Sequence, residues 1–286
     1  MKIRALIRQH GLIAAGVAGF VMFGGVTAAH AQALNPFGNP FGALVVPQMT
    51  NRVEVGFVTA DHDSRDTEND YAVRINHKVG KASAISGSIW GSPREDDPAA
   101  MFQVGMASQI SPRVSMWVNF GGAPTSEHVP NAQYDFGGSF GLDPQLMFTG
   151  AASIRNYQGG PSVRLLAPGV VWVLKPQVIF SATAINSTVT RLAPGVTAGS
   201  NLALFNVILT PHQMITLNLG TGYGESDFLL AAVANSLSQN EASAIFDAQA
   251  TVRFSATRGV NFWYWLDNPN GDRKTNYFQA SVYFEF

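Results

Sequence analysis

The sequence predicts an all-β fold: a closed antiparallel transmembrane β-barrel of about 14 strands, with short periplasmic turns and longer external loops. Three observations predict it: an N-terminal export segment, a final strand that ends on an aromatic residue, and turns at a regular spacing. Charged residues make up only 13% of the chain, yet no long apolar run follows the export segment. Low charge without such runs fits strands that alternate between lipid and a polar interior.

Residues 1–31 have the pattern of a cleaved signal peptide. Lys2, Arg4 and Arg8 precede an apolar run from Gly11 to Val26, and Ala29-His30-Ala31 has the small-x-small pattern of a cleavage site. The run is shorter than the roughly 20 residues that a membrane-spanning helix needs. We therefore predict export, with cleavage after Ala31 leaving Gln32 as the mature terminus.

The mature chain divides into two predicted parts. Residues 32–50 contain three prolines and two glycines, which favours an irregular periplasmic or lumen-lying segment. Residues 51–286 show no linker or composition break, so they are predicted to form one barrel. If Asn51–Val79 did not form a hairpin in the wall, the strand count would fall to twelve.

Tight turns recur along this barrel region. Gly80, Pro112, Pro144 and Pro176 are spaced 32 residues apart, and Thr210-Pro211 and Thr257–Gly259 continue the series. Longer polar stretches lie between them: Asp61–Asp70, Ser92–Pro98, Ala123–Asn131, Asn156–Gly160, Arg191–Ser200, Tyr223–Asn240 and Asn268–Lys274. Six short turns and seven longer loops predict fourteen strands, with both ends of the barrel on the short-turn side.

The predicted strands alternate apolar and polar residues. Val104 and Met106 oppose Gln103, for example, and Phe246 and Ala248 oppose Asp247. A water-soluble β-sandwich also alternates, but its apolar face packs inward. The export segment, the strand length and the terminal Phe286 favour the barrel.

The last strand resembles the C-terminal assembly signal of bacterial outer-membrane barrels. That signal has a polar residue, a small residue and two aromatic residues at alternate positions, here Gln279, Ser281, Phe284 and Phe286. Ser281 stands where glycine is usual. The resemblance implies the barrel-assembly machinery as a partner during insertion, and the outer membrane as the location.

Charge and motifs exclude several functions. Without the export segment the chain carries 15 Lys+Arg against 19 Asp+Glu, which argues against nucleic acid as a partner. The chain has no cysteine, and no motif of a hydrolase, metalloprotease or nucleotide-binding loop occurs. We therefore expect no enzyme, no cofactor and no metal site.

Two groups of surface residues have alternative interpretations. The acidic loop Asp61–Asp70 fails the EF-hand pattern and is interpreted as solvated rather than calcium-binding. With Ser92–Pro98 it is a candidate contact for divalent-bridged lipopolysaccharide, which with outer-membrane lipid is an expected partner. Six aromatic residues are interpreted as interfacial girdles rather than a sugar-binding stripe: Trp117, Trp172, Trp263, Tyr264, Trp265 and Tyr277.

Charged residues on the polar faces of the strands are candidates to line the interior. They are Arg74, Arg113, Asp135, Arg155, Asp247 and Arg253. Such groups pair and fill a narrow barrel, or line a selective channel in a wider one. The leading hypothesis is a small passive pore or binding barrel for small polar solutes or saccharides. The alternative is a non-conducting structural barrel that anchors an envelope or polysaccharide-export assembly.

A family resemblance covers roughly Gln133 to Phe286. Tyr134–Gly138, Arg155–Val170 and Gly222-Tyr223-Gly224-Glu225 resemble the YaiO family of outer-membrane barrels. Many members of that family carry helical repeats before the barrel, whereas here the mature chain enters the strands almost directly. The resemblance implies fold and location, and little about the solute.

Overall fold

The computed structural model describes residues 50–62, 65–93, 98–124, 129–160, 162–190, 197–225, 242–269 and 275–286. They form fourteen strands. The first seven are β1 (Arg52–His62), β2 (Arg65–Val79), β3 (Ser83–Ser92), β4 (Ala99–Ser111), β5 (Val114–Gly122), β6 (Ala132–Gly141) and β7 (Leu146–Asn156). The others are β8 (Ser162–Lys175), β9 (Val178–Thr190), β10 (Thr197–His212), β11 (Ile215–Glu225), β12 (Ala242–Ser255), β13 (Arg258–Pro269) and β14 (Thr275–Glu285).

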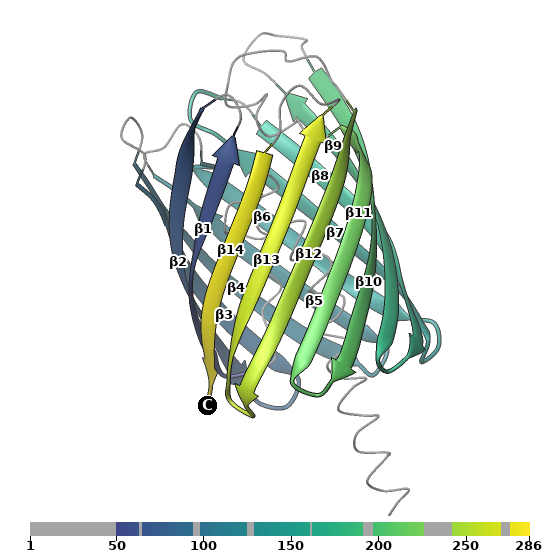
Figure 1. The fold of residues 1–286 in the computed structure, drawn as a ribbon. Coiled ribbons are helices and arrows are strands. Elements are labelled where there is room, and N and C mark those ends of the chain that lie inside the picture. The colour runs from purple at the N-terminus through teal and green to yellow at the C-terminus, as the bar shows by residue number, and fades with distance from the viewer. Residues whose placement is uncertain are drawn as a thin grey trace, which may run out of the picture.

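The strands close into one antiparallel barrel, in which β1 pairs with both β2 and β14 (Figure 1). The predicted fold class and the count of fourteen are confirmed, and the twelve-stranded alternative is wrong because β1 and β2 form a hairpin in the wall. Closure joins the two ends of the chain: the Phe286 N–H donates a 3.0 Å hydrogen bond to the Asn51 carbonyl. Among the described residues, no helix is long and apolar enough to cross a membrane.

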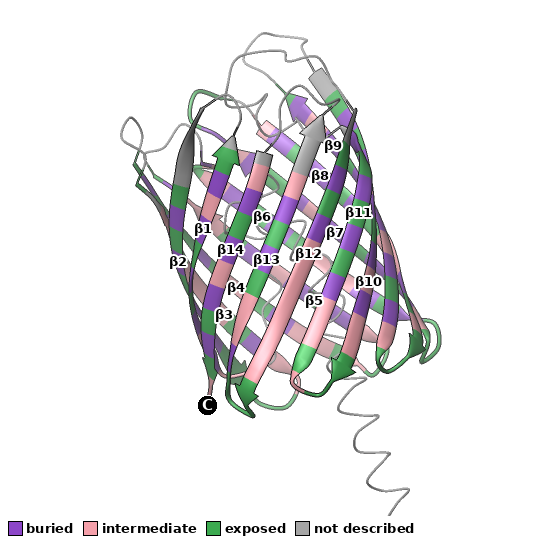
Figure 2. Ribbon diagram, viewed as in Figure 1, coloured by how far each residue is buried: buried purple, intermediate pink, exposed green. Residues whose placement is uncertain are grey.

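The alternation along each strand becomes two faces of the wall (Figure 2). Phe102, Val104 and Met106 on β4 are each more than half exposed and face outward, whereas Gln103 between them is buried. The same pattern holds on β6, where Tyr134 and Phe136 face outward and Asp135 is buried. An apolar face that points away from the interior rules out the β-sandwich and is the arrangement that hydrocarbon stabilises.

The connections follow the predicted asymmetry, with two differences. Most of the segment Asp61–Asp70, predicted as a loop, is strand: β1 extends to His62, β2 begins at Arg65, and these two residues pair. Thr210-Pro211 lies inside β10, which ends at His212. The first and last strands meet as predicted: the start of β1 and the end of β14 lie at the same rim of the barrel, on the side of the short turns (Figure 1).

Candidate functional site: the barrel interior

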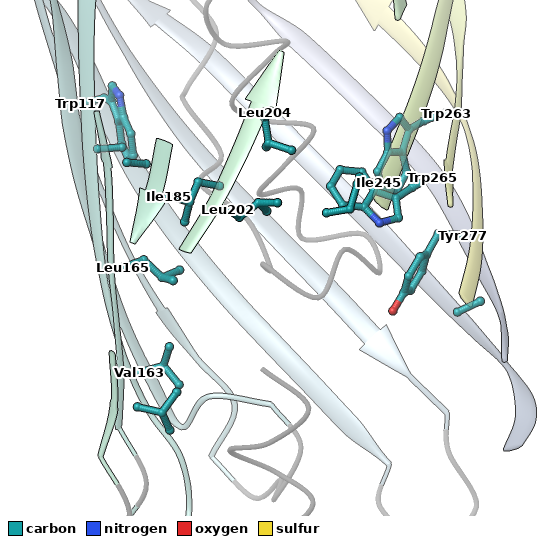
Figure 3. Close-up of a cluster of buried hydrophobic side chains, with 14 of the residues drawn as sticks. Trp117, Val163, Leu165, Ile185, Leu202, Leu204, Ile245, Trp263, Trp265 and Tyr277 are labelled. Carbon is teal, nitrogen blue, oxygen red and sulfur yellow. The ribbon is translucent and has the colours of Figure 1, made fainter. Parts of the chain in front are cut away.

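Most of the buried apolar and aromatic side chains lie in the half of the interior nearer the longer connections. A smaller buried cluster lies near the short-turn ends of β7 to β10: Met147, Val171, Ile179 and Ile208. Figure 3 shows Trp263, Trp265, Ile245 and Tyr277 grouped on one side, with Leu202, Leu204 and Ile185 on neighbouring parts of the wall. Trp265 has no exposed surface, and the rings of Trp263 and Trp265 lie with their centroids 5.9 Å apart and their planes tilted by 46°. This interior is therefore not uniformly polar.

The girdle interpretation is wrong for four of its six residues. Trp117, Trp263, Trp265 and Tyr277 are buried and point inward, whereas Trp172 and Tyr264 face outward. The alternation along the strand could have shown this. Trp263 and Trp265 occupy alternate positions with the polar Asn261, so they share its interior face rather than the outer face of Phe262.

A polar group, here termed the seam cluster, lies at the closing strands near the short-turn end. It consists of Arg52, Glu54, Asn261, Ser281 and Tyr283. The Glu54 carboxylate accepts hydrogen bonds from Arg52 Nη2 at 3.0 Å, Asn261 Nδ2 at 2.9 Å and Ser281 Oγ at 2.5 Å. Arg52 also lies 3.7 Å above the Tyr283 ring. Sequence reasoning did not single out Glu54.

A second polar group lies on β6 and β7. Gln133 Nε2 donates a 2.7 Å hydrogen bond to Asp135 Oδ2, and Arg155 Nε donates a 3.2 Å bond to Ser153 Oγ. Gln133 and Arg155 are opposite each other in the register, as are Asp135 and Ser153. Asp135 and Arg155 therefore face the interior as predicted, on adjacent strands and almost completely buried.

A third polar group centres on Gly220 of β11. Asn206 of β10 and Asp247 of β12 are its two register partners, and both side chains are buried. A Cβ added to Gly220 would lie 2.3 Å from Asn206 Oδ1 and 2.6 Å from Asp247 Oδ2. The absence of a side chain at Gly220 thus lets two side-chain oxygens approach one point from neighbouring strands.

The remaining predicted lining residues divide into two groups. Arg74 is buried and is the register partner of Glu54, and Arg253 is half-buried on the interior face of β12. The prediction for Arg113 is wrong: it lies exposed in the turn before β5, which begins at Val114. The turn predicted at Pro112 also includes Arg113, which the alternation pattern had assigned to the following strand.

The described part of the chain contains no group of three or more His, Asp or Glu side chains that could hold a metal ion. The side chains of the acidic segment 62–68 lie outside the described residues, as do those of residues 94–97. The predicted signal peptide and most of the 32–50 segment also lie outside them.

The four residues of the predicted assembly signal are all described. Gln279 and Ser281 are buried on the interior face of β14, and Phe284 and Phe286 are exposed on the outer side. Phe286 is 73% exposed and follows the last residue of β14, Glu285.

No family model matches the chain, and no curated protein matches it either. Solved structures do resemble it. The translocator domain of autotransporter NalP from Neisseria meningitidis aligns with a TM-score of 0.50 and 11% identity, over 93% of this chain and 99% of that domain. A bacterial polysaccharide outer membrane secretin aligns with a TM-score of 0.54 and 7% identity, over 83% of this chain and 99% of the other. The chain thus has the fold of outer-membrane β-barrels.

Proposed function

We propose that the protein is an exported barrel of the bacterial cell outer membrane whose interior binds small polar solutes or saccharides and passes them without energy input. The observation that carries this proposal is a wall that is apolar outside and bears charged and hydrogen-bonding side chains inside. Lipid and lipopolysaccharide would contact the outer wall. The function proposed is binding and transport rather than catalysis. We also propose a relationship to the YaiO family, supported by Tyr134–Gly138, Arg155–Val170 and Gly222–Glu225.

The location follows from the predicted signal peptide and the outer wall together. Fractionation should recover the protein with the outer membrane, without residues 1–31, and the unboiled protein should migrate differently from the boiled one on a denaturing gel. Recovery of a folded protein in the soluble periplasm would contradict the proposal.

One half-buried part of the interior wall is on β12 near the short-turn end. Gln249, Thr251 and Arg253 share the interior face there and are half-buried, whereas Ile245 and Asp247 farther along the same face are buried. A solute that enters from the short-turn side would meet Arg253 first among the charges of this strand.

Single-channel recording in planar bilayers tests the passive route. We expect a stable conductance whose anion preference falls in Arg253→Glu, because a reversed charge on an accessible interior wall changes ion selectivity. Arg113→Glu is the matched control: it makes the same charge change in an exposed turn outside the interior and should leave selectivity close to that of the wild type. Silent bilayers across several preparations would exclude the pore.

A non-conducting structural barrel is the second candidate. The observation that favours it is the deep burial of many interior side chains, including Trp265, Arg155 and Tyr283. In a wide, water-filled barrel, interior side chains contact solvent. A silent barrel that co-purifies with an envelope or polysaccharide-export assembly would support this candidate.

A further inference from the structure

One side of the barrel interior is apolar along most of its height. The smaller buried cluster, near the short-turn ends of β7 to β10, includes Ile179 and Ile208. Farther up the same strands lie Leu165, Ile185 and Leu204 (Figure 3). These five residues are termed the inner apolar surface. A water-filled barrel has a polar interior, and fourteen strands enclose more space than the eight-stranded barrels that wall side chains fill. The inner apolar surface therefore needs a cover that the wall does not supply.

Two polar side chains interrupt this surface, and both have acceptors that the described residues leave unused. Ser181 lies between Ile179 and Ile185 on β9, and its register partner Asn206 lies between Leu204 and Ile208 on β10. Both residues are more than nine-tenths buried, and Ser181 Oγ and Asn206 Oδ1 have no hydrogen-bond partner in the described ranges. A hydrocarbon cover would leave these oxygens unsatisfied, whereas polypeptide would bring backbone N–H donors. The surface thus fits a polypeptide with apolar side chains.

Residues 32–49 of this chain have the matching composition. They contain no charged residue, and their larger apolar side chains are Leu34, Phe37, Phe41, Leu44, Val45, Val46 and Met49. Their three prolines and two glycines disfavour a regular helix or strand, so the segment offers backbone donors that it does not use internally. In water the segment would expose its apolar side chains. Against the inner apolar surface, both sets of apolar side chains would be covered.

The segment also begins at a suitable place and is long enough. It directly precedes Thr50 and Asn51, and the Asn51 carbonyl is bonded to Phe286 at the short-turn rim. Strands about 4.8 Å apart and tilted by about 40° make a fourteen-stranded barrel roughly 28 Å across between backbones. Residues 32–49 span roughly 60 Å when extended, at about 3.3 Å per residue. They can therefore cross from β1 to β8, which stand opposite each other in the ring, and continue along the wall.

We propose that residues 32–49 enter the interior from the short-turn rim and lie along β7 to β10, on the inner apolar surface. Of the two locations that the sequence left open, this selects the interior. The charged side of the interior, with Glu54 on β1 and Arg253 on β12, stays free. One extended segment fills only part of a barrel of this width, so it narrows a route for solutes without closing it. The proposal goes beyond the transport function, because it holds whether or not the barrel conducts.

The location of the segment is tested by chemical labelling of the mature chain refolded in liposomes. The chain has no cysteine, so Phe37→Cys introduces a single thiol. The reagent is a maleimide on a polyethylene glycol that is too wide to enter the barrel. We expect slow labelling of the folded protein and fast labelling after unfolding in urea. Lys81→Cys is the matched control: it lies exposed in the turn between β2 and β3 and should react quickly in both states.

The cover is tested by removing residues 32–49, so that the chain begins at Thr50. Tryptophan emission should shift to longer wavelength, because Trp117, Trp263 and Trp265 line the interior and would gain water contact. A second variant replaces the segment by glycine and serine at equal length, and it should give the same shift because it lacks the apolar side chains. The unboiled gel band shows that each variant is folded. A synthetic peptide of residues 32–49 should reverse the shift of the truncated protein, whereas the same peptide with aspartate in place of both phenylalanines should not.

Two results would overturn the proposal. Fast labelling of Phe37→Cys in the folded protein would locate the segment outside the barrel. Unchanged tryptophan emission in both segment variants would show that another part of the chain or an apolar solute covers the surface. Single-channel recording separates this proposal from the transport function: where the barrel conducts, truncation should raise the conductance at least about twofold, since it frees cross-section. If neither protein conducts but labelling and emission behave as expected, the transport function fails and the position of the segment stands.

Discussion

The Ser281 hydroxyl donates a 2.5 Å hydrogen bond to the Glu54 carboxylate, across the pair of strands that closes the barrel. Ser281 is the small residue of the predicted assembly signal, and its register partner on β1 is Gly56. A Cβ on Gly56 would lie 2.8 Å from the Ser281 Cβ. The glycine of this pair is Gly56 on β1, and Ser281 on β14 hydrogen-bonds a buried carboxylate.

Ser281→Ala should destabilise the barrel by about 1–3 kcal/mol, because a buried carboxylate loses one of its three donors. The measurement is reversible urea unfolding in liposomes, followed by tryptophan fluorescence. Thr149→Val is the control, since the buried Thr149 hydroxyl has no hydrogen-bond partner in the described ranges. Equal effects of the two substitutions would show that the Ser281–Glu54 bond contributes little.

Gly56→Ala should also destabilise the closing strands, by about 1–3 kcal/mol, because its methyl group overlaps Ser281 and the Ala280 carbonyl. Adding Ser281→Gly should recover part of that loss by removing the side-chain overlap. The double-mutant cycle therefore predicts a favourable coupling between the two positions. Strictly additive effects would contradict direct contact across this pair.

Ala248→Arg and Gln249→Arg test which side of the wall faces lipid. The two residues are adjacent near the middle of β12: Ala248 pairs with the outward-facing Leu219 and Tyr264, and Gln249 faces the interior. We expect Ala248→Arg to cost about 2–4 kcal/mol in lipid bilayers, as a charge on the lipid face does at mid-depth. Gln249→Arg should cost clearly less. The reverse order would contradict the assignment of the two faces.

The fold could be predicted because a barrel wall is one residue thick. Successive side chains of a strand point alternately to the lipid and to the interior. The position of a residue in this alternation therefore predicts the side it faces, as for Gln103, which is buried between the exposed Phe102 and Val104. The same rule locates Trp263 and Trp265 in the interior, and the girdle interpretation was wrong because it weighted residue type above position in the alternation. Arg113 shows the limit of the rule, which fails where a strand gives way to a turn.

The contacts inside the barrel could not be predicted in the same way. Glu54 binds Asn261 and Ser281, which are 207 and 227 residues away along the chain. Such contacts depend on the register of the closing pair, and no local pattern encodes that register. The convergence of Asn206 and Asp247 likewise depends on Gly220 standing between them in the sheet.

Removal of Phe286 should impair insertion into the outer membrane while synthesis and export continue. Its side chain is exposed on the outer side of the wall, and its backbone N–H is bonded to Asn51 at the start of the closing pair. We therefore expect the last residue to act as a recognition feature during insertion, and its backbone also joins the edge that closure must cover. The measurement is the amount of heat-modifiable protein in the outer-membrane fraction relative to total exported protein. Phe286→Tyr keeps an aromatic ring and the backbone bond, so it should insert nearly normally. A truncated protein present at wild-type levels in that fraction would refute the role of Phe286.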